Sequence, residues 1–123
     1  MERALIVFGS GGVGCVARYL VTVAVGRRPF PYATLIVNLA GSFLIALVLE
    51  LALARKDLPI NLQLALTTGF MGGFTTYSSF NFETTKLVLD GHLARGLINV
   101  GATLAGAFAA GLLGLWVARR IAS

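Results

Sequence analysis

The chain alternates between long apolar stretches and short charged clusters. Four apolar stretches cover residues 4–26, 33–54, 62–89 and 97–118. Each is near or above the roughly 20 residues that a helix needs to cross a hydrocarbon core about 30 Å thick. Because the connections are short, successive helices should be antiparallel neighbours. The pattern predicts an all-α membrane protein with four transmembrane helices, forming a single integral membrane domain over residues 1–123.

Composition points to the same class. Hydrophobic residues make up 57% of the 123 residues and charged residues 12%, which leaves too little polar surface to cover a soluble domain of this size. The net charge of +5 is explained by basic residues at the two lipid headgroup layers, and we expect no nucleic-acid binding. The single cysteine, Cys15, permits no internal disulfide and is expected to pack within its helix.

Basic residues are divided almost evenly between the two sides of this topology. The side of both termini carries Arg3, Arg55, Lys56, Arg119 and Arg120, and the other side carries Arg27, Arg28, Arg95 and, near the end of its span, Lys86. Because orientation follows the side richer in Lys and Arg, the near-balance suggests insertion in both orientations. A single orientation, set by the slight excess, is an equal alternative on charge alone.

Oligomerisation is expected because four short helices have little interior with which to line a path through one copy. The last span carries a stripe of small residues, four apart on one face: Ala102, Gly106, Ala110 and Gly114. Such a stripe lets helix backbones approach closely, either within a subunit or between subunits. Simple packing is its stronger interpretation.

The third span holds the least helix-friendly residues of the chain. In the stretch TTGFMGGFTTYSSFNFETTK, residues 67–86, three glycines, Gly69, Gly72 and Gly73, precede the β-branched pair Thr75 and Thr76. This combination weakens a helix, and we predict a break near Gly72–Thr76. Irregular backbone at membrane depth is tolerated where it is buried in protein or lines a cavity, and its free carbonyls can bind a hard cation.

Beyond the predicted break, aromatic and polar residues recur at helical spacing. Tyr77 and Phe80 are three apart, and Glu83 and Thr84 are predicted to continue the same face. Core packing would ordinarily explain two aromatic rings. It does not explain why glycines, threonines and an acid occur together with them.

Polar residues also interrupt the other spans, where each is costly and needs a partner or a cavity. Arg18 either extends to the nearer interface or provides a fixed cation at a pore mouth. Asn38 and Ser42, four apart, serve either as hydrogen-bonding contacts between helices or as donors to an anion. Asn99 and Thr103 add a second polar strip. No carboxylate precedes Glu50 in the first two spans, which disfavours a small dual-topology proton-coupled multidrug-type antiporter, the main alternative class.

Three segments, GGVGCVARY, ATLIVNLAGSF and above all GFMGGFTTYSSFNFE, resemble the Fluc/CrcB fluoride ion channels, which are small four-helix membrane proteins of bacteria. The resemblance covers essentially the whole chain. It implies an antiparallel, dual-topology homodimer in the bacterial inner membrane that passively exports fluoride. No residue pattern suggests covalent chemistry, so we do not expect an enzyme. A non-conducting assembly subunit is a further alternative, but it would not explain the broken polar helix.

The resemblance also implies roles for individual residues. Gly72 and Thr75 match positions whose backbone carbonyls hold a structural sodium ion that is not transported. Asn38 matches the pore asparagine, Arg18 the arginine of the vestibule, and Phe80 the second ring of a phenylalanine pair along the fluoride path. The remaining candidates in the polar lining are Ser78, Ser79, Glu83, Thr84 and Thr103.

This sequence departs from the family pattern at two positions. Tyr77 stands where the first phenylalanine is usual, and Asn99 stands where a tyrosine is expected in the fourth span. Both residues are kept as pore candidates. Fluoride holds water strongly, so a selective path must replace that water with amide and hydroxyl donors and with positive ring edges.

Overall fold

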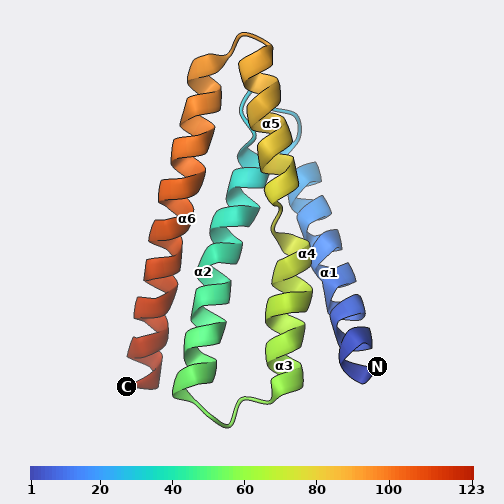
Figure 1. The fold of residues 1–123 in the computed structure, drawn as a ribbon, viewed down its shortest axis with the longest axis vertical. Helices are drawn as coiled ribbons and strands as arrows, with labels where there is room; N and C mark the ends of the chain where they lie inside the picture. Colours follow the sequence, from blue (N-terminus) through green and yellow to red (C-terminus); the bar gives the residue numbers. More distant parts are fainter.

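All regular structure is helical in the computed structural model, which describes residues 1–123. The elements in order are α1 (Glu2–Val25), α2 (Tyr32–Ala54), α3 (Ile60–Leu64), the π-helix η1 (Ala65–Met71), α4 (Gly72–Phe74), α5 (Tyr77–Leu89) and α6 (Leu93–Ala122). Figure 1 shows that α3 to α5 form one broken segment, that successive segments run antiparallel, and that both termini lie at the same end. The prediction of an all-helical, antiparallel fold is confirmed.

Helices α1, α2 and α6 are long and apolar enough to cross a membrane. The most apolar is α2, with a mean hydropathy of 2.2 over its best window. Helix α6 is longer than the predicted span 97–118, because it begins at Leu93 and ends at Ala122. The predicted third span is divided among short elements, so no single helix in it reaches that length.

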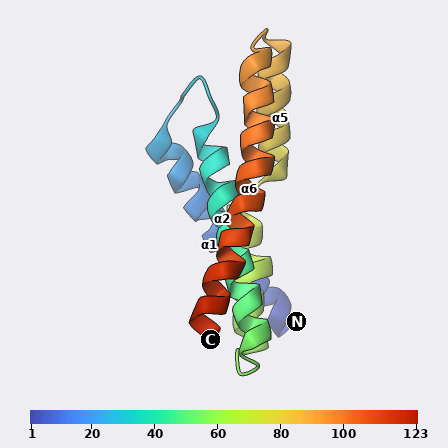
Figure 2. The same cartoon turned by 90° about the vertical axis from the view of Figure 1, so that its left-hand side faces the viewer.

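Small residues bring α6 close to α2. A Cβ atom added to Gly114 would collide with the backbone oxygen of Phe43, and one added to Gly106 would lie 3.0 Å from the Leu39 side chain. The stripe therefore packs two helices of one subunit, as its simpler interpretation required. In Figure 2, α5 rises beside the first half of α6, so that α6 contacts both α2 and α5.

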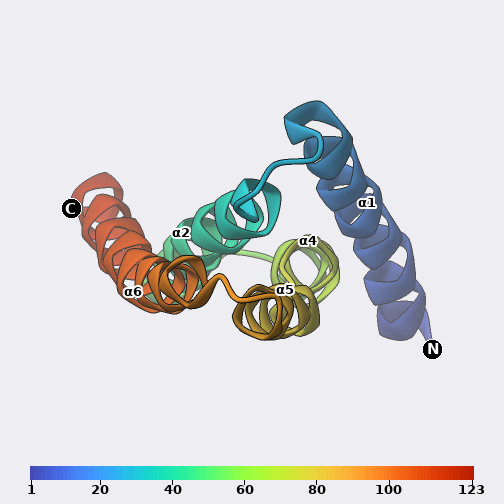
Figure 3. The ribbon, with the colours of Figure 1, turned by 90° about the horizontal axis from the view of Figure 1, so that it is seen from above.

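Glycines also allow α1 to pack on the broken segment. A Cβ atom on Gly14 would collide with the backbone of Phe70, and one on Gly73 would collide with the Gly11 carbonyl oxygen. Seen from above, α1 and α6 lie on opposite sides of the molecule (Figure 3). The broken segment lies between them and contacts both, through η1 and α4 on one side and α5 on the other.

The break lies at Thr75 and Thr76, inside the predicted range. Both residues have extended backbone, with ψ of 158° at Thr75 and φ of −152° at Thr76. Helix α5 then begins at Tyr77, because the Thr76 hydroxyl accepts a hydrogen bond from the Ser79 N–H and caps the new helix. The π-helix before the break was not predicted, since a shift from i+4 to i+5 bonding has no local residue signature.

The isolated subunit has a small interior. Only 12 of its 123 residues are buried, and the exposed side chains include large apolar residues of every long helix. The fold therefore leaves most of its apolar surface to be covered by lipid or by another protein copy.

Candidate functional site

Asn38 fastens the break to α2. Its Oδ1 accepts a hydrogen bond from the Thr76 N–H at 2.8 Å, and its Nδ2 donates to the Thr76 carbonyl oxygen at 3.0 Å. The amide thus pairs with both backbone groups of an extended residue, which have no helical partner. One N–H of Asn38 remains for a ligand. Ser42, the other candidate on this face, donates to the Asn38 backbone oxygen at 2.7 Å.

Arg18 reaches the break from α1. Its Nε donates to the Gly73 carbonyl oxygen at 3.0 Å, so the side chain does not extend along α1 to the interface. Arg18 is thus held at the break, and its role as a fixed cation at a pore mouth stays a prediction. The remaining guanidinium N–H groups lie at a cavity described below.

Two carbonyls at the break lose their helical donors. The Gly72 oxygen would normally accept from Thr76 and the Thr75 oxygen from Ser79, but those N–H groups donate to Asn38 and to the Thr76 hydroxyl instead. Neither carbonyl accepts another backbone hydrogen bond across the break. Gly72 is also exposed on the subunit surface. These oxygens therefore fit the ligands that a hard cation such as sodium prefers.

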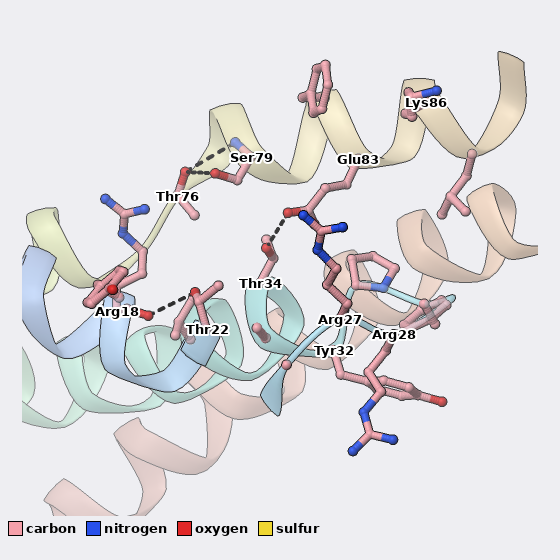
Figure 4. Close-up of a pocket in the computed structure, with 18 of the residues that line it drawn as sticks. Arg18, Thr22, Arg27, Arg28, Tyr32, Thr34, Thr76, Ser79, Glu83 and Lys86 are labelled. Carbon is pink, nitrogen blue, oxygen red and sulfur yellow. Dashed lines mark hydrogen bonds between the residues drawn. The ribbon is translucent and has the colours of Figure 1, made fainter. Parts of the chain in front are cut away.

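A cavity of about 660 Å³, here called the Arg18 cavity, lies on one side of the break between α1, α2, α5 and the α1–α2 loop. Arg18, Ser79 and Glu83 line it, as Figure 4 shows. Glu83 Oε1 accepts a hydrogen bond from the Thr34 hydroxyl at 2.8 Å, while its Oε2 is buried without a partner. Cys15 also lines this cavity and is exposed in the single subunit, while its Sγ lies next to Gly73 of the broken segment, so its role as a packing residue stays a prediction.

A second cavity, of about 760 Å³ and here called the Phe80 cavity, lies on the other side of the break, toward α6. It brings together seven candidates: Asn38, Ser42, Gly72, Thr75, Tyr77, Phe80 and Thr103. Phe80 is 8% exposed and Tyr77 is 78% exposed, and their ring centroids are 5.9 Å apart. The Thr103 hydroxyl is buried without a hydrogen-bond partner. Thr76 lines both cavities, so the break separates them.

The prediction that Glu83 continues the Tyr77–Phe80 face is wrong. A helix turns about 100° per residue, so Glu83 lies about 120° around the helix from Tyr77, on the face of Ser79. That face borders the Arg18 cavity. Thr84 does continue the aromatic face.

Three candidates lie outside both cavities, namely Ser78, Thr84 and Asn99. Asn99 is 1% exposed, and its Nδ2 donates to the Thr84 hydroxyl at 2.8 Å. That hydroxyl in turn donates to the Phe80 backbone oxygen at 2.7 Å. In the subunit, Asn99 and Thr84 therefore connect α6 to the turn of α5 that carries the Phe80 ring. Their direct contact with an ion stays a prediction.

Sequence reasoning missed four threonines that line the cavities: Thr22, Thr34, Thr67 and Thr68. Thr34 precedes Asn38 by four residues. The helical spacing that places Ser42 on the same face as Asn38 therefore also places Thr34 there. Thr67 and Thr68 lie in η1, where the wider turns change which residues share a face. No sequence signal for a π-helix was available to place them.

Comparison with known proteins gives consistent matches along the chain. The model of the family described as CrcB-like protein, Camphor Resistance (CrcB), matches residues 5–115. A protein of Geobacter sulfurreducens named fluoride-specific ion channel FluC is 45% identical over 121 residues, covering 96% of each chain. A protein of the same name from Sorangium cellulosum is 45% identical over 124 residues, covering 98% of each chain. Another from Chlorobaculum tepidum is 47% identical over 111 residues, covering 89% of this chain and 88% of the relative. With its family match over 111 residues and relatives at this identity along nearly its whole length, the protein belongs to the CrcB family.

Proposed function

We propose that this protein is a fluoride-selective ion channel that passively exports fluoride and so reduces its toxicity to the cell. One observation carries the proposal: Arg18, Asn38 and Phe80, from three different segments, converge on a helix break that separates two cavities. The relatives named as fluoride-specific channels support the choice of ion. Passive conduction requires no covalent step, so the proposed role is that of a channel and not of an enzyme.

The geometry suits a small, strongly hydrated anion. Around Phe80, the free N–H of Asn38, the Thr103 hydroxyl and the ring edges are all partners that can replace water. In the Arg18 cavity, the guanidinium and the hydroxyl of Ser79 offer further donors. Ser78, Thr84, Asn99 and Glu83 complete the proposed polar lining, with Tyr77 as the outer ring.

We further propose that two copies assemble antiparallel, in dual topology. The subunit exposes 7771 Å², whereas a compact soluble protein of its mass would expose about 6,300 Å². Tyr77, which belongs to the proposed path, is 78% exposed in the single chain. The end bearing the termini carries five basic residues, against four at the opposite end. A second copy in the opposite orientation would cover the exposed residues of the break.

Sodium is the proposed structural ion of this dimer. The carbonyl oxygens of Gly72 and Thr75 would hold it, because both lack a backbone donor. When bound, the ion would add a fixed positive charge near the midplane and lower the cost of bringing an anion there. It would not be transported.

The sodium site can be tested with backbone-directed variants. Thr75→Ser keeps the carbonyl and should be mild, whereas Thr75→Pro removes the N–H that donates to the Met71 oxygen at 3.0 Å and should be severe. Exchanging sodium for a bulky organic cation during purification should reduce fluoride efflux and dimer stability. Unchanged efflux and assembly without sodium would contradict the site.

The proposed location is the inner membrane of a bacterial cell, as a multi-pass protein surrounded by lipid. Helices α1, α2 and α6 supply three crossings by length and hydropathy. The fourth crossing would be the broken segment from Ile60 to Leu89, whose irregular backbone is bonded to Asn38 and Arg18. This arrangement meets the requirement that backbone groups at membrane depth be satisfied within the protein.

Halide efflux from liposomes that contain the purified protein tests the function. We expect rapid fluoride efflux, little chloride efflux, and no dependence on a pH gradient. A flux that follows the pH gradient would favour the antiporter. No fluoride efflux, or equal efflux of chloride, would overturn the channel assignment.

A further inference from the structure

The α1–α2 loop places two adjacent arginines in different environments. Helix α1 ends at Val25, and Gly26 follows with φ of 71°, a left-handed conformation that favours glycine. Figure 4 shows the Arg27 side chain turned toward Thr34 and Glu83 in the Arg18 cavity, whereas Arg28 is turned away from them. Arg28 Nε donates to the Val25 carbonyl oxygen at 3.2 Å. Arg27 makes no hydrogen bond or ion pair.

The other charges of the Arg18 cavity are already engaged. Lys86 forms an ion pair with Asp90 at 2.7 Å, and Arg18 donates to the Gly73 carbonyl. The only acid that lines the cavity, Glu83, accepts a hydrogen bond from Thr34 and forms no ion pair with Arg27. Arg27 is thus the cation of this cavity with all its N–H donors free.

A charge in this position acts on ions before they reach the break. Walls of low dielectric constant concentrate the field of a charged group at the mouth of a cavity and raise the local concentration of counter-ions. An exposed guanidinium also presents several donors to a hydrated anion without requiring that the anion lose all its water. Arg28 carries the same charge and also lines the cavity, but its side chain is turned away from Thr34 and Glu83 and its Nε is engaged by the Val25 carbonyl.

We propose that Arg27 captures fluoride at the entrance of the Arg18 cavity and so sets the concentration range over which the channel conducts. This inference rests on the proposed function. It assigns Arg27 to the delivery of the ion, outside the narrow path at Phe80. Removal of the charge should therefore change the fluoride concentration that gives half-maximal flux and leave the maximal rate unchanged.

The matched pair Arg27→Gln and Arg28→Gln tests the proposal in liposomes, because both variants remove one positive charge from the same loop. At low salt, Arg27→Gln should raise the half-saturating fluoride concentration by about threefold to tenfold. Arg28→Gln should change it by less than about twofold, because the Arg28 side chain, although it also lines the cavity, is turned away from Thr34 and Glu83 and its charge is screened by solvent. Arg27→Lys keeps the charge and should restore the wild-type value.

The dependence of flux on ionic strength provides a second test, and for the wild-type protein it does not depend on whether a variant folds correctly. The difference between wild type and Arg27→Gln should shrink when an impermeant salt is raised from about 10 mM to about 1 M, where the screening length falls from about 30 Å to 3 Å. Wild-type flux should itself fall in the same range.

Several outcomes would overturn the inference. Equal effects of the two glutamine variants would show that position is irrelevant, and a lower maximal rate at unchanged half-saturation would indicate a structural role. Wild-type flux that ignores salt would exclude capture by charge. A wild-type protein with no fluoride flux would instead refute the proposed function, so the two failures are distinguishable.

Discussion

Single polar residues at the break act mainly by replacing hydrogen bonds that the helix loses there. Asn38 binds both backbone groups of Thr76, and Arg18 donates to the Gly73 oxygen. A buried donor or acceptor left without a partner costs about 1–3 kcal/mol. These side chains therefore have a structural task that is separate from any contact with an ion.

Asn38→Ala should reduce both stability and fluoride flux. The substitution leaves the Thr76 N–H and carbonyl without their partners, at a cost of about 1–3 kcal/mol for each group left buried. Thermal unfolding of the purified protein, measured beside liposome efflux, checks this. Ser42→Ala is the control for stability, because its hydroxyl donates only within α2. If Asn38→Ala lost flux but unfolded at the wild-type temperature, Asn38 would serve the anion alone.

Phe80 should matter more to conduction than Tyr77. Phe80 is buried and lines the Phe80 cavity, whereas Tyr77 is largely exposed in the single subunit. Phe80→Ile removes the positive ring edges and should cut fluoride efflux strongly while the dimer still forms. Tyr77→Phe removes a hydroxyl that could retain the ion or a water, so efflux should be unchanged or higher.

Efflux rates for the two variants, with size-exclusion chromatography to check assembly, decide between the two rings. A freely conducting Phe80→Ile beside an inactive Tyr77→Phe would place the limiting contact at the phenol.

The broken segment, viewed as an element, combines three irregularities. The π-helix η1 shifts the helical register, α4 adds a single turn, and Thr75–Thr76 interrupts the helix. The segment is held on both sides, by Gly14 and Arg18 of α1 and by Asn38 of α2. Small residues at these contacts let neighbouring backbones come close enough to support it.

Gly41→Ala should disturb the break from the α2 side. Gly41 is buried, and a Cβ atom there would collide with Cγ2 of Thr75. Such overpacking costs about 1–3 kcal/mol, and any relief by movement of Thr75 shifts a proposed sodium ligand. Lower dimer stability and lower fluoride efflux are therefore expected.

Gly12→Ala is the matched control, since no atom lies within 4 Å of its added Cβ. Its efflux should equal that of wild type. Equal behaviour of the two alanine variants would mean that the contact between Gly41 and Thr75 does not position the break.

The whole molecule is an open bundle rather than a closed one. Helices α1 and α6 lie on opposite sides of the broken segment, and few residues are buried. Nearly equal basic charge at the two ends leaves the bundle without a strong orientation signal. The proposed pairing with an inverted copy would account for both features.

Fixing the orientation should abolish activity unless the opposite orientation is also supplied. Asp57→Lys with an added C-terminal lysine makes one end more basic, and Asp90→Lys with His92→Lys does the same for the other. Each version alone should give little fluoride efflux, and co-expression of both should restore it. Accessibility of tagged loops verifies the orientation. Full efflux from one version with a single accessible side would refute the antiparallel dimer.

Much of this organisation follows from local patterns in the sequence. Runs of apolar residues predicted the helical segments, because a helix needs about 20 such residues to cross the hydrocarbon core of a membrane. The Gly72–Thr76 stretch predicted the break, because glycine and paired β-branched residues weaken a helix wherever they occur. The segments around Arg18, Asn38 and Phe80 also identified the family, which the comparisons confirmed.

Only the tertiary structure decided which polar groups meet. Asn38 is separated from Thr76 by 38 residues and Arg18 from Gly73 by 55, so the partners of these side chains depend on how whole helices pack. The π-helix likewise depends on the packing of α1 and α2 around the segment, and it turns Thr67 and Thr68 toward a cavity. Helix packing also places Tyr77 and Phe80 at one cavity and Glu83 at the other. It likewise turns Arg27 toward Glu83 and Arg28 away from it. Residue type and spacing determine what a helix can present, whereas its rotation and the chain opposite determine what each side chain contacts.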